Sequence, residues 1–480
     1  MVSAPIVVDL DGTLIHTDML YESGLTLLRK QPVSALIAGF QLGRGKAAFK
    51  QWIADRTQGF NYAALPYNAE LLAWLATQKQ AGRKLVLCTA SDRQIAQGVA
   101  DHLGIFDEVL SSDGKNNLAG ERKAQALVDR YGAKGFDYAG NATPDLKVWP
   151  HANQAIVVNA KDGLGKQVKA SHSNVAIISP AQKLGMKDGL KVLRAHQWLK
   201  NLLLLIPVFT AHLLGDMSVW QNLLFGFVAF CLCASAVYIL NDLLDLESDR
   251  LHPRKRQRPF ASGRVPIALG IAAIPVLLAS SLAMALNVNM LFLDCLLVYF
   301  TLTSAYSWWL KRWMLIDCLT LSGLYTLRIL AGAAAASLTP SVWLLGFSVF
   351  LFLSLAFVKR YAELAAMPPG GAGEKAHGRG YYQSDASMVQ MFGVTSGYAA
   401  VVVLSLYFNS DTVQRLYSKP EFTWAAVPVV LFWVSWMWMQ AHRGKMHDDP
   451  IVFAIKDKIS LLAGAVFIAV LSVGASGLWQ

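Results

Sequence analysis

Short apolar runs alternate with amphipathic stretches over the first third of the chain. Runs typical of β-strands cover Pro5 to Leu10, Lys84 to Cys88, Phe136 to Ala139 and Gln154 to Asn159. Stretches with the apolar spacing of helices lie between them, such as Ala69 to Gln80 and Arg122 to Tyr131. This alternation predicts βαβ units and therefore an α/β domain with a parallel sheet.

From about residue 200 the pattern changes to long runs that are almost free of charge. They occupy roughly 201–217, 219–240, 265–286, 289–310, 314–336, 341–358, 386–408, 422–440 and 459–479. Most of them reach the ~20 residues that a helix needs to cross a bilayer. We expect nine membrane-spanning helices, or eight if the first run, whose strictly apolar part is short, does not cross.

These patterns predict a two-domain protein. Residues 1–160 form the α/β domain, and residues 189–480 form an all-α, polytopic membrane bundle. Residues 161–188 are polar and carry no strong period, so we expect them to be a linker. Longer polar connections after the second and sixth runs hint at an internal repeat of four spans.

Composition and charge agree with a membrane protein. Hydrophobic types make up 54% of the 480 residues and charged types 16%, against about 25% in soluble proteins. The net charge of +11 comes mainly from connections on one side of the bundle, whereas the opposite connections carry only Arg415 and Lys419. This positive-inside distribution needs no nucleic acid to explain it. Without a secretory signal at the N-terminus, it predicts an inner (plasma) membrane protein with a cytoplasmic N-terminal domain and an outer C-terminus.

Two carboxylates follow the first predicted strand. Asp9 and Asp11 stand in the run V-V-D-L-D-G-T-L, at the strand end where α/β sheets bind ligands. The pair suits a nucleophile and a general acid/base around a Mg²⁺ ion. The run resembles the first motif, DxDGT, of the haloacid dehalogenase (HAD) superfamily of phosphatases. Thr89, at the end of L-V-L-C-T, and Lys123, in E-R-K-A-Q-A-L, resemble the second and third motifs.

The fourth HAD motif is altered in this chain. Where the family has GDxxxD, the sequence reads G-N-A-T-P-D, with Asn141 in place of the usual Asp and Asp145 at the end. The resemblance implies that Asp9 attacks a phosphate, that Asp11 is the acid/base, and that both bind Mg²⁺ together with Asn141 and Asp145. It also implies a helical cap at about residues 15–65. Because Asn141 gives the site one negative charge fewer than the usual Asp, we expect the change to affect the affinity for Mg²⁺ rather than the phosphatase chemistry.

A second acidic group lies at the cytoplasmic end of the second apolar run. Asp242, Asp245 and Asp249 fall at i, i+3 and i+7, on one face of a helix. Acids at a membrane boundary are costly unless they hold a cation, so they predict a Mg²⁺ site that binds a substrate diphosphate. Neighbouring polar residues that would contact this diphosphate are Asn241, Arg250, Lys255 and Arg258. The basic residues alone fit the positive-inside rule equally well.

The pattern N-D-x-x-D-x-x-x-D resembles that of the UbiA superfamily of intramembrane prenyltransferases. Most members carry a second acidic motif, DxxxD, after the sixth span, but this chain has Lys359, Arg360 and Glu363 there. Two cations can hold a monophosphate without metal. With R-A-H-Q-W-L-K-N before the first run, this departure resembles the decaprenyl-phosphate phosphoribosyltransferases, in which the acidic motif holds phosphoribosyl diphosphate and a lipid phosphate is the acceptor.

Further polar residues are candidates for a central substrate cavity. They are Lys200, Asn201, Tyr306, Lys311 and Arg328. An arginine inside a membrane span is a functional candidate by default. For Arg328, an ion pair with Asp317 or Asp294 is an equally good interpretation.

The sequence therefore predicts an Mg²⁺-dependent, bifunctional membrane enzyme. It would transfer 5-phosphoribose from phosphoribosyl diphosphate to a polyprenyl phosphate, and its HAD domain would remove the 5-phosphate to leave a pentose donor for a cell-envelope glycan. One alternative is an aromatic prenyltransferase of quinone biosynthesis, which the missing second DxxxD disfavours. The other is a transporter, which would need polar groups at the midplane of several spans.

Overall fold

A computed structural model of the chain describes residues 4–476 except 42, 44, 161, 181–182, 214, 368–378 and 447–448. The chain divides into two compact units. The first comprises Met1–Arg194 together with Tyr238–Pro275, and the second comprises Ala195–Val237 together with Val276–Gln480. The acidic segment 238–275 thus belongs to the same unit as the N-terminal domain.

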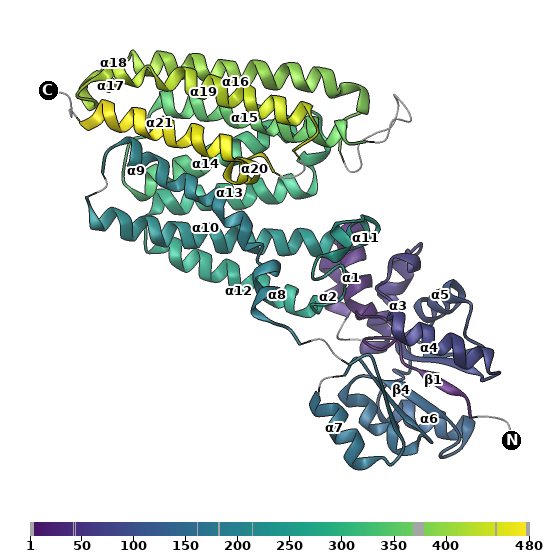
Figure 1. The fold of residues 1–480 in the computed structure, drawn as a ribbon. Helices are drawn as coiled ribbons and strands as arrows, with labels where there is room; N and C mark the ends of the chain where they lie inside the picture. The colour runs from purple at the N-terminus through teal and green to yellow at the C-terminus, as the bar shows by residue number, and fades with distance from the viewer. Residues whose placement is uncertain are drawn as a thin grey trace. The chain divides into compact units, whose positions relative to one another are not determined.

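A parallel, six-stranded sheet forms the centre of the N-terminal domain (Figure 1). Its strand order is β3-β2-β1-β4-β5-β6. The strands are β1 (Ile6–Val8), β2 (Leu85–Asp92), β3 (Glu108–Ser112), β4 (Asp137–Gly140), β5 (Ala155–Val158) and β6 (Val175–Ile178). The predicted α/β class is confirmed, and the first strand lies between β2 and β4.

Alternating side chains of the strands form two separate cores, one on each face of the sheet. Ile6 and Val8 pack with Leu85 and Leu87 in one core, while Val7 packs with Val86 in the other. Burial on both faces explains why β1 reads as an unbroken apolar run. The helices of this domain are α4 (Ala69–Gln80), α5 (Arg93–Leu103), α6 (Glu121–Tyr131) and α7 (Asp162–Ser171).

Residues between the first two strands are helical, as expected for a cap. They form α1 (Met19–Lys30), α2 (Pro32–Gln41), α3 (Lys46–Arg56) and the short 3₁₀ helix η2 (Tyr62–Ala64). Asp18 caps α1, since its side chain accepts a hydrogen bond from the Leu20 amide. Two further 3₁₀ turns, η3 (Thr143–Lys147) and η4 (Trp149–His151), follow β4.

The segment expected to be a linker contains regular structure. Within 161–188 lie α7, the edge strand β6 and the start of α8 (Met186–Val192). β6 pairs with β5 along its whole length, so the sheet domain extends to Ile178. The segment 161–188 is therefore not a linker over its whole length, because the sheet domain continues past residue 160.

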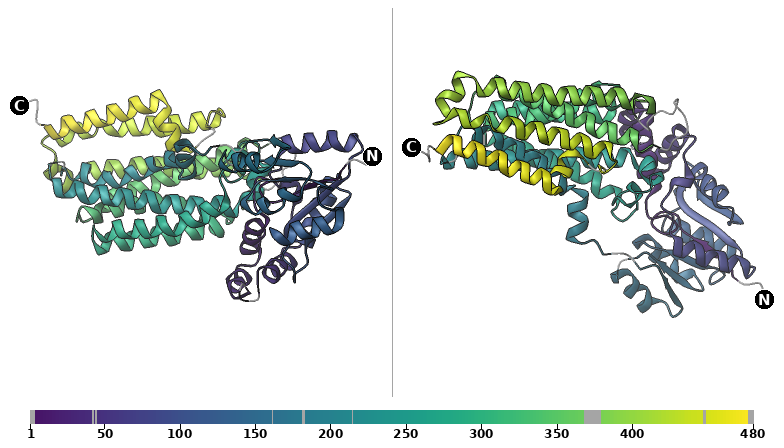
Figure 2. Two further views of the ribbon diagram at one scale, coloured as in Figure 1. Left: turned by 90° about the horizontal axis from the view of Figure 1, so that it is seen from below. Right: turned by 45° about the horizontal axis from the view of Figure 1, so that its top comes forward.

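Apolar helices make up the rest of the chain, and Figure 2 shows those of the second unit running alongside one another. Before the acidic segment come η5 (Ala195–Leu205), α9 (Ile206–Thr210) and α10 (Met217–Leu244). The acidic segment continues with α11 (Leu246–Leu251) and η6 (Lys255–Gln257). The remaining elements are α12 (Ile267–Leu286), α13 (Met290–Trp308), η7 (Leu310–Arg312), α14 (Ile316–Ala335), α15 (Val342–Ala365), η8 (Gln383–Asp385), α16 (Ala386–Phe408), α17 (Asp411–Leu416), α18 (Pro420–Thr423), α19 (Ala426–His442), α20 (Pro450–Lys456) and α21 (Lys458–Ser476).

Among the described residues, eight helices are long and apolar enough to cross a membrane. The first expected span is not one of them, so the lower of the two predicted numbers holds. That run forms η5 and α9, where Pro207 begins a new turn and Lys200 and Asn201 are buried against polar partners. The predicted class, a polytopic helical bundle, is otherwise confirmed.

Candidate active sites

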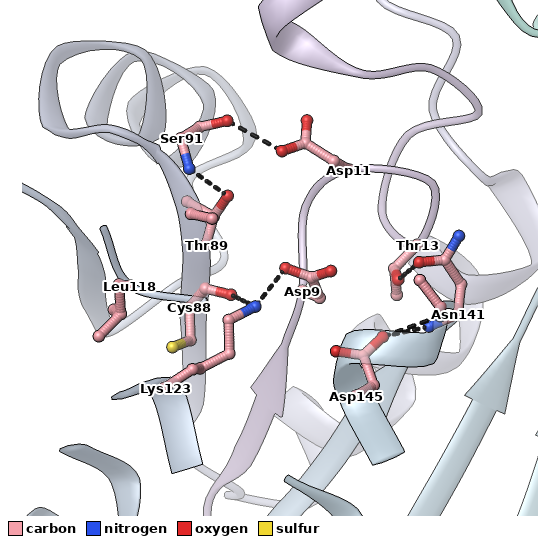
Figure 3. Close-up of polar contacts among 12 residues, drawn as sticks. Asp9, Asp11, Thr13, Cys88, Thr89, Ser91, Leu118, Lys123, Asn141 and Asp145 are labelled. Carbon is pink, nitrogen blue, oxygen red and sulfur yellow. Dashed lines mark hydrogen bonds and ion pairs between the residues drawn. The ribbon is translucent and has the colours of Figure 1, made fainter. Parts of the chain in front are cut away.

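Lys123 and Asp9 form the centre of a buried polar site at the carboxyl ends of the strands (Figure 3). Lys123 Nζ, from α6, lies 2.7 Å from Asp9 Oδ1 and also contacts the Cys88 carbonyl at 3.2 Å and the Tyr138 hydroxyl at 3.1 Å. Burial raises the pKa of Asp9 to about 6, although the charge of Lys123 opposes this shift. The predicted nucleophile and phosphate-binding lysine are thus in contact.

Asp11 is oriented by two donors on either side of its carboxylate. The Met19 amide donates to Oδ1 at 2.8 Å, and the Ser91 hydroxyl donates to Oδ2 at 2.9 Å. Burial, with the charges of Asp18 and Asp9, raises the pKa of Asp11 to about 7. A carboxyl group that holds its proton near neutral pH suits general acid catalysis.

The residues of the fourth motif lie on the other side of Asp9 (Figure 3). Asn141 Oδ1 accepts a hydrogen bond of 3.2 Å from Thr13 Oγ1. The approach is tight, because a Cβ atom at Gly12 (φ +76°) would lie 2.1 Å from Asn141 Nδ2. Asp145 accepts hydrogen bonds from the Tyr138 hydroxyl at 2.7 Å and from the backbone N–H of Asn141 at 2.9 Å.

These positions allow a test of whether Mg²⁺ fits the HAD site. The carboxylate of Asp9 and the side-chain amide of Asn141 present oxygen atoms, the type of ligand that Mg²⁺ prefers. Both carboxylate oxygens of Asp145 already accept hydrogen bonds, so this residue holds the turn after β4. Thr89 likewise uses its hydroxyl locally, to accept from the Ser91 amide at 3.0 Å. Asp11 is in the same position, since the Met19 amide and the Ser91 hydroxyl donate to its two oxygens. The residues that fit Mg²⁺ are therefore chiefly Asp9 and Asn141.

In the acidic segment a one-residue interruption at Asp245 separates two helices. α10 ends at Leu244 and α11 begins at Leu246, while the hydrogen bonds from the Asp245 amide to the Asn241 carbonyl (2.9 Å) and from the Asp249 amide to the Asp245 carbonyl (2.8 Å) keep helical spacing. Asp242 and Asp249 share a cation. Arg258 Nη1 lies 3.0 Å from Asp242 Oδ1 and 2.6 Å from Asp249 Oδ2.

A second arginine contacts the same carboxylate. Arg194 Nε donates to Asp242 Oδ2 at 3.2 Å, and its Nη2 also contacts this group. Burial raises the pKa of Asp249, against the effect of Arg258. Among the described residues no group of three or more acidic, histidine or cysteine side chains is arranged to hold a metal. Two of the expected ligands thus share cations, while Asp245 and Asn241 are half-buried beside them.

The neighbouring basic residues differ in their surroundings. Lys255, in η6, is exposed. Arg250 is buried and donates to Glu22 in α1 at 2.6 and 3.1 Å. The structure thus gives Arg250 a partner other than a diphosphate.

In the second unit, two lysines and a tyrosine meet at one carboxylate oxygen. Asp449 Oδ2 lies 2.7 Å from Lys200 Nζ and 3.6 Å from Lys359 Nζ, and it accepts from the Tyr325 hydroxyl at 3.4 Å. Burial opposes the shift, but the two lysines lower the pKa of Asp449 to about 2. Three donors around one anionic oxygen have the chemistry of a site for a phosphate monoester.

Arg328 lies deeper in this unit and uses its donors within the protein. It donates to Asn201 Oδ1 at 2.9 Å, to the Tyr299 hydroxyl at 2.9 Å and to the Leu324 carbonyl at 2.6 Å. Its guanidinium carbon lies 4.7 Å from the centre of the Tyr299 ring, within cation–π range. An ion pair with Asp317, one of the expected alternatives, is wrong because Asp317 contacts Arg360.

Arg360 is fully buried in an ion pair. Its Nη2 lies 2.6 Å from Asp317 Oδ2, both side chains are 0% exposed, and Nη1 also contacts Glu363. The Tyr381 hydroxyl donates to Asp317 at 2.6 Å. We expected Arg360 and Glu363 to contact substrate. The geometry instead gives Arg360 an ion pair that joins α15 to α14, whereas Glu363 contacts Arg360 within α15 and its side chain is 41% exposed.

Two predicted residues lie near the end of α13. Tyr306 accepts a hydrogen bond of 2.9 Å from Arg379 Nη1. Lys311, in η7, is half-buried.

Comparisons with known proteins identify both parts. Residues 204–366 match the UbiA prenyltransferase family, and residues 24–146 match the haloacid dehalogenase-like hydrolases. The decaprenyl-phosphate phosphoribosyltransferase of Mycolicibacterium smegmatis is 31% identical over 278 residues, which are 56% of this chain and 86% of that protein. The chain belongs to the UbiA prenyltransferase family. It is therefore a multi-pass membrane enzyme with a HAD-like hydrolase domain.

Two further relatives of this UbiA-family chain show how far the likeness extends. A protein of Sinorhizobium fredii named uncharacterized protein y4nM is 37% identical over 465 residues, covering 96% of this chain and 89% of that protein. A solved structure of a UbiA homolog from Archaeoglobus fulgidus, bound to GPP and Mg²⁺, is 17% identical with a TM-score of 0.46 and covers 60% of this chain and 100% of that chain. The alignment with the Sinorhizobium protein thus spans both the HAD-like and the UbiA-like regions.

The sequence analysis assigned no role to several residues that contact the predicted site residues of this UbiA-family protein. Ser91 and Tyr138 contact Asp11 and Lys123 but lie outside the quoted motifs. Arg194 is the first residue of the quoted run R-A-H-Q-W-L-K-N, and Asp449 stands in the polar run H-D-D-P-I-V-F before the last apolar stretch. Their contacts with Asp242 and Lys200 were not predicted.

Proposed function

We propose that this protein transfers 5-phosphoribose from phosphoribosyl diphosphate to a polyprenyl phosphate. An oxygen of the lipid phosphate would bond to the anomeric carbon as the bond from that carbon to diphosphate breaks. The observation that carries the proposal is the meeting of Lys200 and Lys359 at one oxygen of Asp449. The match to the M. smegmatis phosphoribosyltransferase supports it independently.

The donor diphosphate would bind at the acidic segment. Members of this family are typically Mg²⁺-dependent, and the carboxylates of Asp242, Asp245 and Asp249 are the groups that would hold the metal. When bound, Mg²⁺ supplies charge stabilisation for the leaving diphosphate. Arg258 pairs with two of these carboxylates, and its guanidinium is the group that would also bind the diphosphate.

The acceptor phosphate would bind at the Lys200–Lys359 site. Lysine binds phosphate as a compact charge and needs no metal for a monophosphate. Lys359 is 31% exposed, so it remains accessible to a lipid headgroup. A prenyl diphosphate, as used by an aromatic prenyltransferase, would bring more charge than two lysines neutralise.

The HAD domain would carry out a second step, the removal of the 5-phosphate. Asp9 would attack the phosphorus, and Asp11 would give its proton to the departing 5-hydroxyl group. Water would then release phosphate from Asp9. The raised pKa of Asp11, about 7, supports its role as the acid. The product would be polyprenyl-phosphoryl ribose, a membrane-bound pentose donor for a cell-envelope glycan.

The proposal also places the protein in the inner membrane, with the N-terminal domain in the cytoplasm and the C-terminus on the outer side. The testing experiment incubates purified protein with Mg²⁺, labelled phosphoribosyl diphosphate and polyprenyl phosphate, and then extracts the lipid. Label in the lipid phase is expected. Label that stays in water, with transfer of a prenyl group to an aromatic acid instead, would support the quinone alternative, and no reaction at all would favour a transporter.

A further inference from the structure

A buried ion pair joins the cap of the HAD domain to the acidic segment, within the first unit. Arg250 Nη2 and Nη1 donate to the two carboxylate oxygens of Glu22 at 2.6 and 3.1 Å. The Arg250 side chain is 7% exposed and that of Glu22 is 4% exposed. The two residues are 228 positions apart, so chain connectivity does not explain their contact.

Neighbouring groups hold both partners in place. Thr17 Oγ1 donates to Glu22 Oε1 at 2.7 Å, and Arg250 Nε donates to the Ala261 carbonyl at 2.9 Å. The guanidinium is thus bound along both of its edges. A planar, five-donor group held in this way is not free to bind a phosphate.

A second contact lies beside this pair and involves backbone. Gly263 (φ +71°) lies in the acidic segment, and a Cβ atom added there would lie 2.5 Å from His16 Cβ and 2.7 Å from the His16 carbonyl oxygen. His16 belongs to the turn between Asp11 and α1, so the acidic segment touches the turn that carries the phosphatase acid. Any larger residue at position 263 would force the two segments apart.

Burial decides how much these contacts matter. An exposed ion pair such as Arg29–Glu247, at 3.4 Å with both side chains more than 40% exposed, contributes little to stability because water screens the charges. Removing one partner of a buried pair costs far more, because it leaves an uncompensated charge out of water. The Glu22–Arg250 pair therefore selects one arrangement of α1 and α11, which Figure 1 shows near one another.

We propose that Glu22 and Arg250 form a latch that docks the phosphatase cap on the acidic segment. The HAD domain would act on the lipid-linked sugar from a docked position rather than from a flexible tether. Glu22 is then a positioning residue. This inference rests on the proposed function only for its effect on the lipid product.

Hydrogen exchange of the full-length protein in detergent tests the latch without any substrate. We compare the wild type with Glu22→Gln, with Arg250→Met and with the double variant Glu22→Leu/Arg250→Met, which removes both buried charges. Each variant is expected to exchange amides faster in both 19–30 and 246–264, while β1 and β4 keep their protection. Arg29→Gln, at the exposed pair, is the matched control and should exchange like the wild type. Faster exchange in α1 alone, or wild-type exchange in both segments, would overturn the latch.

A thiol cross-link tests the contact even if those variants fold poorly. Arg29→Cys with Glu247→Cys introduces two cysteines at the exposed pair, whereas the described native cysteines are buried or half-buried. Because an Arg–Glu pair spans more than the short reach of a disulfide, the two thiols are joined with a short bismaleimide. Mass spectrometry of the digest is expected to find the two segments joined, and no cross-linked peptide after complete labelling of both cysteines would contradict docking.

The lipid product then separates this inference from the proposed function. In Glu22→Gln we expect transfer and hydrolysis of p-nitrophenyl phosphate to stay within about twofold of wild type, while the dephosphorylated fraction of the lipid falls about tenfold or more, since docking raises effective concentration. An unchanged fraction would overturn the functional role of the latch. If the wild-type lipid keeps its 5-phosphate although exchange and cross-linking show docking, the latch stands and the proposed second step fails.

Discussion

Lys200 Nζ lies 2.7 Å from Asp449 Oδ2, although 249 positions separate these residues along the chain. Each side chain is only 10% exposed, so the two charges are paired out of water. Lys359 and Tyr325 approach the same oxygen atom. The carboxylate therefore occupies the position in which an anion would find three donors.

Asp449→Asn is expected to lower the Tm of the ligand-free protein but to increase the rise in Tm that polyprenyl phosphate causes. Without the carboxylate, Lys200 is a buried and unpaired charge, which costs about 3 kcal/mol in the ligand-free protein. A bound phosphate would restore that compensation. Thermal unfolding with and without polyprenyl phosphate measures both effects. An equal shift in Tm for wild type and variant would show that the phosphate binds elsewhere.

Lys359→Ala is expected to weaken binding of the acceptor, polyprenyl phosphate, without affecting binding of the donor. Because Lys359 reaches Asp449 from α15, its loss removes one of two cations from the acceptor site. We expect KM for polyprenyl phosphate to rise about tenfold or more while KM for phosphoribosyl diphosphate stays the same. Lys445→Ala, an exposed lysine of the second unit, is the control. A change in donor KM alone would remove Lys359 from the acceptor site.

Arg360→Met is expected to act on stability rather than on substrate affinity. Its loss leaves Asp317 charged and fully buried, at a cost of about 3–5 kcal/mol. The double variant Arg360→Met/Asp317→Leu removes both charges and should recover most of that loss. Steady-state kinetics of the folded fraction measure affinity, and a specific rise in KM for the lipid would restore Arg360 as a substrate ligand.

Asp245→Ala is expected to reduce transfer by two or more orders of magnitude, since the metal would carry the charge of the leaving diphosphate. Chelation with EDTA should have the same effect on the wild type, and added Mg²⁺ should reverse it. Glu247→Ala serves as control, because Glu247 lies two positions further along and is exposed. Near-normal transfer by Asp245→Ala would show that this carboxylate is not a ligand.

Asp9→Asn is expected to leave transfer intact while the lipid product keeps its 5-phosphate. Asn retains the shape of the side chain but is a poor nucleophile. Mass spectrometry of the extracted lipid distinguishes the two products by one phosphate group. If wild type and variant give the same phosphorylated lipid with ample Mg²⁺, the HAD domain acts on something else.

The HAD-like site could be predicted because its residues follow strands. In a parallel sheet the carboxyl ends of neighbouring strands meet, so Asp9 after β1, Thr89 in β2 and Asn141 after β4 had to be close. The edge strands β3 and β6 were missed, since E-V-L-S-S is only partly apolar and V-A-I-I stands in a polar segment. Edge strands need less burial, so their pattern is weaker.

Pairing between membrane helices could not be predicted in the same way. Arg360 looked like a substrate ligand because it replaces an acid of the family motif, but its partner Asp317 lies on another helix. Asp449 and Lys200 are 249 positions apart in the sequence, with most of the membrane helices between them. Periodicity shows which face of a helix is polar, but packing alone decides which polar faces meet.

The order of strands in the sheet also bears on how the chain is made at the ribosome. β1 lies between β2 and β4, and the last strand ends at Ile178, so the sheet can close before any membrane helix has been synthesised. Glu22 has to wait for Arg250, which is 228 residues later. At the usual speed of translation this delay is roughly 10 to 45 s. During that interval the folded N-terminal domain carries the Glu22 carboxylate without its partner Arg250. The ion pair can form only after the second apolar run and the segment that follows it have been synthesised.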